Sequence, residues 1–274
     1  MLKKFLRVMI WVLLVVVIYV LLDAIPAART PAFSADVLPN AATYCGTDAE
    51  NELIFRLTGL GASAVHDFKQ AGVLESALEI FYRQKQEALH TKDEYLCFPT
   101  TKAEVLHDEE GSRRELVFPP VHAGDILITK STETLLYRHG HAALVLDDSG
   151  RTIESFMIGV PSDILTVDNW RSYSTVMILR PKISQKEIAQ KAAEYAETSL
   201  QNIPYNICTG IRKKDKSETG VDSTQCAHLV WQAYYASGLD IDGDGGWLVT
   251  PHDVTKCSEF EVVFSFGFGK NSTW

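Results

Sequence analysis

The chain has 274 residues, of which 46% are hydrophobic and 10% are aromatic. These values are typical of a globular protein with a well-buried core, and they exclude a disordered chain. The net charge of -9 argues against a nucleic-acid-binding protein, because backbone phosphates need a basic surface. We therefore expect one main globular domain with attachments and no nucleic-acid partner.

Residues 1–23 predict a transmembrane anchor or a signal peptide. Three basic residues, Lys3, Lys4 and Arg7, precede an unbroken apolar run over 8–22. This run is shorter than a span of about 20 residues, but with Phe5 and Leu6 included and Arg7 at the interface it can cross a bilayer. A basic flank on the N-terminal side places the rest of the chain outside the cytoplasm. We favour a retained anchor over a cleaved signal peptide, which would make the protein secreted.

Residues 24–115 predict a linker and a helical segment. The Pro- and Ala-rich stretch 24–40 reads as the linker, and helices are expected at 48–60, 63–70 and 74–90. One face of the last helix is apolar, with Leu74, Ala77, Leu78, Phe81 and Tyr82. The region contains no catalytic cluster, and we interpret it as a helical cap. The polar and charged residues over 101–114 indicate its boundary.

Residues 116–274 predict the main domain, of the α+β class with an antiparallel sheet packed on helices. Strands are expected up to 129, over 139–146 and 151–156 as a hairpin, over 175–179 and over 260–266. A loop or short helix is expected at 163–170. The segment 183–201 predicts a helix with Ser184 as its N-cap. A further helix begins at Cys226.

Cys226 is the strongest candidate for a reactive residue. After it, Leu229, Val230, Ala233 and Tyr234 recur at helical spacing, which places the thiol in the first turn of a helix. A helix N-terminus favours thiolate over thiol, and the thiolate is the nucleophile. The alternative is a buried or disulfide-bonded cysteine.

The number of cysteines bears on whether Cys226 could be disulfide-bonded. The five cysteines are Cys45, Cys97, Cys208, Cys226 and Cys257. In an oxidising compartment two bridges leave one thiol over. One pairing that leaves Cys226 free joins Cys45 to Cys97 and Cys208 to Cys257, although the sequence does not fix the connectivity and all five could be reduced.

The hairpin brings a base and a carboxylate together in one of two registers. With a two-residue loop at Asp148 and Ser149, His141 lies opposite Phe156 and Glu154 is its diagonal neighbour on the same face. A three-residue loop slips the register by one position and puts Ser155 on that face. The sequence leaves both registers open.

Four stretches together resemble one family. They are the Gly-Asp-led strand from Gly124, the His141-to-Glu154 hairpin, the Pro204-Tyr205 turn and the Cys226 helix with Gln225 before it. They look like the core of NlpC-type cell-wall peptidases. Because the histidine precedes the cysteine, the match is to the circularly permuted papain-like branch that includes the YiiX, YebB and YycO proteins and, more distantly, lecithin:retinol acyltransferases. It covers roughly 118–265.

This resemblance implies a role for each matched residue. Cys226 would be the nucleophile, His141 the general base and Glu154 the group that orients it, with Tyr205 and Gln225 as substrate or oxyanion-site residues. The implied activity is an extracytoplasmic cysteine hydrolase, a thiol amidase or peptidase that acts on cell-wall peptide amides through an acyl-enzyme and needs no cofactor. The alternatives are a lipid amide or ester hydrolase or acyltransferase of the same fold, and a non-catalytic binding module.

The sequence also allows two metal-binding interpretations, which have less support than the cysteine hydrolase. His139, His141 and Glu154 could ligate zinc, but no third imidazole stands at ligand spacing. The segment 240–245 matches the first half of a calcium loop, but Pro251 stands where the bidentate glutamate is required. We favour a metal-free site and a solvated turn.

Overall fold

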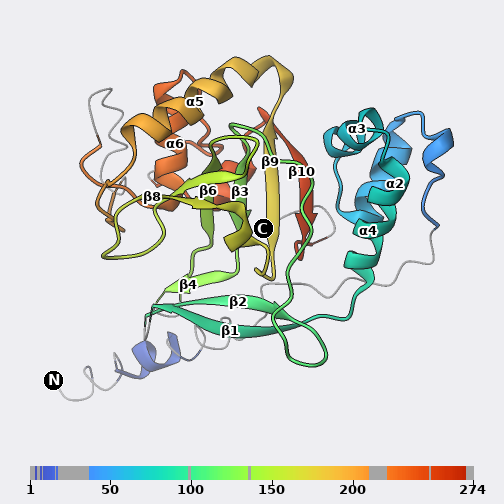
Figure 1. Cartoon of the computed structure of the whole chain (residues 1–274). Helices are drawn as coiled ribbons and strands as arrows, with labels where there is room; N and C mark the ends of the chain where they lie inside the picture. The colour runs from blue at the N-terminus through green and yellow to red at the C-terminus, as the bar shows by residue number, and fades with distance from the viewer. Residues whose placement is uncertain are drawn as a thin grey trace.

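The computed structural model describes residues 4, 7, 9–15, 17, 37–97, 100–134, 137–209, 221–246 and 248–269. Two antiparallel sheets and the helices packed on them form an α+β protein, as the sequence predicts (Figure 1). Within the described part of the chain, no helix is long and apolar enough to cross a membrane. Most of the predicted anchor over 1–23 lies outside the described residues.

Between residues 37 and 90, which the structure describes, three α-helices lie close to where the sequence predicts them. They are α2 (Asp48–Thr58), α3 (Ala62–Gln70) and α4 (Leu74–Gln86), after a short 3-10 helix, η1 (Ala41–Thr43). A capping box between Thr47 and Glu50 starts α2. The predicted extension of α4 to residue 90 is wrong, because the chain becomes extended after Gln86 and enters a strand at His90.

The smaller sheet has the strand order β1-β2-β4-β5. Its strands are β1 (His90–Cys97), β2 (Thr101–His107), β4 (Thr132–Thr134) and β5 (Tyr137–Arg138). The reading of 101–114 as a polar boundary is wrong for its first half, because β2 is almost wholly buried and pairs with β4. Its buried carboxylate, Glu104, pairs with Arg138, 3.2 Å away, so a segment with charged residues can still lie inside the protein.

The larger sheet has the strand order β10-β9-β3-β6-β7-β8, and all its pairs are antiparallel. Its strands are β3 (Ile126–Thr129), β6 (His141–Val145), β7 (Arg151–Glu154), β8 (Asp163–Thr166), β9 (Val176–Pro181) and β10 (Phe260–Phe266). The stretch expected as a loop or short helix is thus strand β8 followed by the 3-10 helix η2 (Val167–Trp170). The hairpin and the strands near 126–129, 175–179 and 260–266 are confirmed.

Between β9 and β10, the described residues form three α-helices. They are α5 (Lys186–Ser199), α6 (Cys226–Ala236) and α7 (Pro251–Thr255), with η3 (Ile183–Gln185) before α5. Ser184 is not the N-cap of α5, because η3 takes up this residue and Gln185 stands at the cap. The helix at Cys226 begins where the sequence predicts it.

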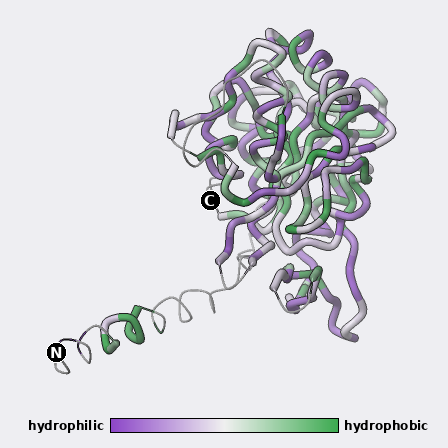
Figure 2. Tube along the Cα trace, turned by 90° about the vertical axis from the view of Figure 1, so that its left-hand side faces the viewer, coloured by the Kyte–Doolittle hydropathy of each residue, from purple (hydrophilic) through white to green (hydrophobic). Residues whose placement is uncertain are grey.

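Residues of the central strands alternate between two cores. Ile126, Ile128 and Leu144 pack with α5 and α6, whereas Leu127 and Val145 pack with the helical segment α2–α4, β2 and η2. This alternation follows from the two-residue period of a strand. Figure 2 shows the consequence, with hydrophobic segments through the middle of the body and mostly hydrophilic loops around it. The larger sheet is therefore covered on both faces.

The helical segment is joined to the edge strand β10. The turn between α2 and α3 pairs with it: Gly61 donates its N–H to the carbonyl of Val263 at 2.8 Å, and Ser265 donates to Gly59 at 2.9 Å. A Cβ atom at Gly61 would lie only 1.8 Å from the carbonyl oxygen of Val262, so only glycine fits there. Figure 1 shows α3 beside β10. The turn covers an edge that would otherwise expose unpaired backbone groups.

Candidate active site

The hairpin has the register in which Glu154 faces His141. Leu144 pairs with Ile153 and Val145 pairs with Thr152, which is the register of a two-residue loop. Gly150 has φ +85° and donates its N–H to the carbonyl of Asp147 at 3.1 Å, so it closes the turn rather than extending the loop. As a result, Oε2 of Glu154 lies 2.7 Å from Nε2 of His141. Both side chains are buried.

Cys226 is the first residue of α6, and Gln225 fixes the start of that helix. The side-chain oxygen of Gln225 accepts a hydrogen bond from the Ala227 N–H at 3.0 Å and one from the Cys226 thiol at 3.4 Å. Its side-chain nitrogen donates to the carbonyl of Val249 at 2.9 Å. Gln225, predicted as a substrate or oxyanion-site residue, is thus the helix N-cap and a contact of the thiol. Cys226 itself is 6% exposed.

His141 joins the thiol and the carboxylate. Burial alone would lower the pKa of this imidazole, but hydrogen bonds from its ring to Cys226 and to Glu154, together with the charges of both groups, raise the pKa to about 9. Because Nε2 faces Glu154, Nδ1 is the nitrogen left for the thiol. The arrangement can transfer the thiol proton to the imidazole and hold the resulting thiolate and imidazolium as an ion pair.

Two further side chains hold Glu154, and sequence reasoning assigned no role to either. Oε1 of Glu154 accepts a hydrogen bond from the Thr152 hydroxyl at 2.7 Å and another from the Trp170 indole N–H at 2.9 Å. The Trp170 ring also stacks on the His141 ring, with centroids 5.1 Å apart and planes 17° apart. Thr152 could have been found from its position two residues before Glu154 on one strand face. Trp170 gives no local signal.

Tyr205 lies within electrostatic reach of the nucleophile. Burial raises the pKa of its phenol, and the charge of Cys226 raises it further. A parallel β-bridge links Tyr205 to Thr224, two residues before the cysteine, and this bridge explains how the Pro-Tyr turn reaches the start of α6. The structure thus brings Cys226, His141, Glu154, Tyr205 and Gln225 into one neighbourhood.

His139 points to other partners. Its Nε2 lies 2.9 Å from the Thr134 hydroxyl and its Nδ1 lies 2.5 Å from the Gly140 carbonyl. Burial lowers the pKa of His139 to about 4, and the charge of His141 acts in the same direction. His139 is therefore neutral at physiological pH, and it lies in the connection between β5 and β6. The three proposed zinc ligands, His139, His141 and Glu154, do not converge on one point.

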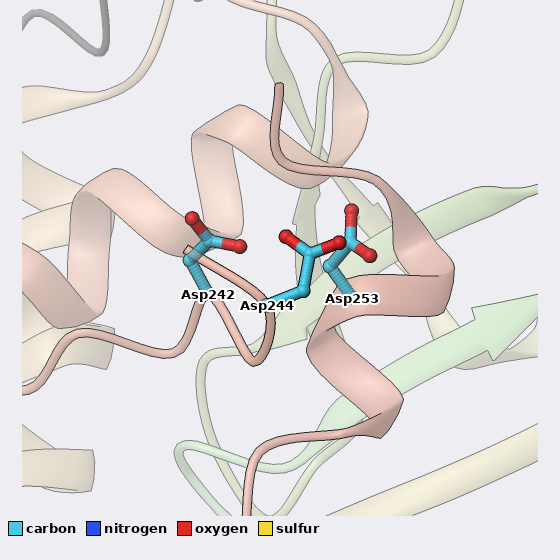
Figure 3. A group of neighbouring side chains, drawn as sticks. All are labelled: Asp242, Asp244 and Asp253. Atoms are coloured by element: carbon cyan, nitrogen blue, oxygen red, sulfur yellow. The ribbon is translucent and has the colours of Figure 1, made fainter. Parts of the chain in front are cut away.

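Within the described residues, the group close enough to hold a metal ion is Asp242, Asp244 and Asp253, whose oxygen atoms lie within 4.8 Å of one another (Figure 3). The Lys256 ammonium lies 3.3 Å from Asp253 and 3.9 Å from Asp244. Asp253 also accepts the capping-box hydrogen bonds of Thr250 at the start of α7. The Lys256 ammonium thus supplies the positive charge that a bound metal ion would supply between these carboxylates. This arrangement agrees with a turn that packs against α7.

All five cysteines are free thiols. The pairing of Cys45 with Cys97 and of Cys208 with Cys257 is therefore wrong. The Cys45 thiol instead donates to the carbonyl of Thr43 at 3.3 Å. The number of cysteines limits how many disulfide bridges a chain could form, but it does not determine which sulfur atoms lie close together.

Comparisons with known proteins give one distant relative to report. The uncharacterized protein YycO of Bacillus subtilis (strain 168) is 28% identical over 162 residues, which cover 57% of this chain and 60% of that protein. The chain thus matches about three fifths of its relative's length. No family model and no solved structure matches. The similarity agrees with the YycO part of the resemblance and shows a distant homology without a family assignment.

Proposed function

We propose that this protein is a cysteine hydrolase of the circularly permuted papain-like type, with Cys226 as nucleophile, His141 as general base and acid, and Glu154 as the group that orients the imidazole. The observation that carries the proposal is the 2.7 Å hydrogen bond between the buried side chains of His141 and Glu154, together with the influence of the Cys226 thiol, at the start of α6, on the pKa of the same imidazole. A nucleophile, a base and an orienting group in this order form the machinery of acyl transfer.

The reaction has two halves. The Cys226 thiolate attacks the carbonyl carbon, a C–S bond forms, and the C–N or C–O bond to the leaving group breaks as His141 returns its proton to that group. Water then attacks the thioester; His141 takes the water proton and returns it to the thiolate as the C–S bond breaks. The Cys226 backbone N–H, in the first turn of α6, has no carbonyl partner within the helix and is the natural donor to the oxyanion, whereas the Ala227 N–H already donates to the side chain of Gln225. Tyr205 lies within electrostatic reach of Cys226.

Cell-wall peptide amides are the substrate class that the resemblance favours. The predicted anchor over 1–23 would hold the catalytic domain, over 116–274, outside the cytoplasmic membrane, where such peptides lie. The helical segment within 24–115 packs against β9 and β10, where Arg180 joins Asp67 at 2.8 Å. It would therefore support the catalytic sheet rather than act as an independent module.

Lipid amides or esters are the second candidate, because apolar side chains follow the site residues. Phe156 packs edge-on against the His141 ring, with centroids 5.4 Å apart. Beyond it, Ile158 and Val160 are exposed, and Ile207 is exposed two residues after Tyr205. Backbone hydrogen bonds between Ser162 and residues 202 and 203 join these two loops. Apolar side chains beside a site suit a substrate with an acyl chain.

A comparison of variants tests the proposal. Detergent-solubilised full-length protein, Cys226→Ala and His141→Ala are incubated with purified wall fragments and, separately, with acyl-lipids, and the products are identified by mass spectrometry. Release of a peptide or of a fatty acid by the wild type alone selects between the two substrate classes. No turnover of either class, together with a Cys226 that an electrophilic probe fails to label in the wild type, would reject the hydrolase in favour of a binding module.

A further inference from the structure

Trp170 is tied to the candidate site by two different contacts. It lies at the end of η2, which follows the edge strand β8, and its side chain is fully buried. The indole N–H donates to Oε1 of Glu154 at 2.9 Å, and the indole face stacks on the ring of His141. One side chain therefore touches both members of the His141–Glu154 pair.

These contacts restrict the rotation of the Glu154 carboxylate and of the His141 ring. Glu154 accepts one hydrogen bond at Oε2, from His141, and two at Oε1, from Thr152 and Trp170. The carboxylate therefore cannot turn without breaking a hydrogen bond inside a buried site, which is unfavourable. The stacked indole and the edge-on ring of Phe156 hold the imidazole plane.

A second tryptophan shows what a purely structural indole looks like in this protein. Trp231 is also fully buried, and its indole N–H also donates to a carboxylate, that of Asp240 at 2.8 Å. Asp240 lies on the surface in the loop after α6, and Trp231 stacks on Tyr235 rather than on a site residue. The two tryptophans have matching burial and matching hydrogen-bond chemistry but different neighbours.

We infer that Trp170 is a positioning residue of the hydrolase: it holds Glu154 and the His141 ring in the orientation in which His141 keeps Cys226 as a thiolate. The inference rests on the proposed function, because it assigns Trp170 a role in that site. Trp170 does not touch the reacting atoms. It acts through the carboxylate and the imidazole.

The expected consequence is a change in how the reactivity of Cys226 depends on pH. A thiolate held by an imidazolium reacts at neutral pH, whereas an unassisted thiol with a pKa near 8.5 is only a few per cent ionised at pH 7. Several titratable groups act electrostatically on these residues. Cys226 and Glu154 act on His141, and His141 acts on His139. Glu154 acts on Tyr173, and Cys226 acts on Tyr205. Trp170→Phe, Trp231→Phe and Thr152→Val leave all of them in place.

The test measures the alkylation rate of Cys226 by iodoacetamide from pH 5.5 to 10, with the modified peptide quantified by mass spectrometry so that the other four cysteines do not interfere. Trp170→Phe removes the N–H and keeps an aromatic ring, and Trp231→Phe is the matched control. In Trp170→Phe we expect alkylation about tenfold slower at pH 7, the effect of losing one hydrogen bond to a charged group, and convergence with the wild type by about pH 10. The profile of Trp231→Phe should match that of the wild type.

Two further variants keep the inference testable. Thr152→Val removes the other donor to the same oxygen with little change of shape and should slow alkylation in the same direction, which covers the case that Trp170→Phe does not fold. In a Glu154→Gln background, Trp170→Phe should have a much smaller effect, because the carboxylate that the indole N–H holds is gone and phenylalanine keeps an aromatic ring beside His141.

The outcomes separate the two proposals. A wild-type Cys226 that reacts at neutral pH, with Trp170→Phe equal to the wild type, would overturn the positioning role and leave the hydrolase intact. An undiminished effect of Trp170→Phe in the Glu154→Gln background would also overturn it, because packing alone would then explain the loss. A wild-type Cys226 with the pH profile of an unassisted thiol would overturn both proposals.

Discussion

Both sheets of this protein bury carboxylates, but they neutralise them differently. In the smaller sheet, Glu133 lies 2.7 Å from the Lys102 ammonium and 3.8 Å from the Arg138 guanidinium, and Arg138 also pairs with Glu104. In the larger sheet, Glu154 pairs with His141, whose pKa is raised by both the Cys226 thiol and Glu154. Lys102 and Arg138 are cations that keep their protons at physiological pH. His141 can exchange its proton, and this difference distinguishes an ion cluster that supports the fold from one that can perform chemistry.

The largest loss of turnover is expected from substitution of the two residues that exchange the proton, Cys226 and His141. Cys226→Ala should abolish turnover, and His141→Ala should reduce it by roughly 10²–10⁴-fold, the usual contribution of a general acid and base. Steady-state rates on the substrate class identified above provide the measurement. Turnover by Cys226→Ala at the wild-type rate would remove the nucleophile from the account.

A matched pair of substitutions compares the two carboxylates directly. Glu154→Gln should lower turnover on the order of 10²-fold, because the amide no longer provides the charge that stabilises the imidazolium. Glu133→Gln should leave turnover within about threefold and lower the free energy of unfolding by about 1–3 kcal/mol, because two cations lose a charged partner. Kinetics and urea titration on the same preparations test both statements. Equal losses of turnover in the two variants would contradict the division between the sheets.

The two clusters should also respond differently to pH. The folded-state pKa of His141 is raised from 6.5 to about 9, so its contribution to stability is fully present below about pH 6.5 and is lost as the pH rises through about 9. The stability difference between wild type and His141→Gln should therefore shrink over this window. The difference between wild type and Glu133→Gln should stay nearly constant there, because lysine and arginine side chains in general lose their protons only at higher pH. Urea titrations at pH 6, 7.5 and 9.5 give both differences, and a constant His141 contribution would contradict the raised pKa.

The smallest effect concerns the three aspartates beside α7. Because Lys256 lies within 4 Å of Asp244 and Asp253, a chelator such as EDTA should leave both turnover and the melting temperature unchanged. Differential scanning fluorimetry with EDTA and with added Ca²⁺ measures the melting temperature under both conditions. A clear rise in melting temperature with Ca²⁺ would show that the ion displaces the lysine.

The parts of the fold that are local in sequence could be predicted. The hairpin around Gly150 and the helix at Cys226 follow from turn residues and from apolar periodicity over a few positions, and the structure contains both. Even so, the register of the hairpin depended on how Gly150 closes the turn, which residue type alone does not decide.

The remaining parts depend on contacts between distant residues. Strand β2 reads as a charged loop because Glu104 finds its counterion, Arg138, only 34 positions later. Trp170 reaches His141 from 29 positions away, after an edge strand that the sequence did not reveal. No local pattern encodes these pairings, because the partners are brought together by the sheets.

The proposed pairing of the Cys226 thiol with the His141 imidazole is tested most directly by the protonation state of the His141 ring, read from its ¹⁵N chemical shifts by NMR across pH 5–10. The ring is expected to be an imidazolium at pH 7.5 in the wild type, and its titration midpoint should move to lower pH in Cys226→Ala, because the thiolate that helps to hold the proton is gone. A midpoint near 6.5, unchanged by the substitution, would show that sulfur and imidazole do not interact and would contradict the proposed hydrolase.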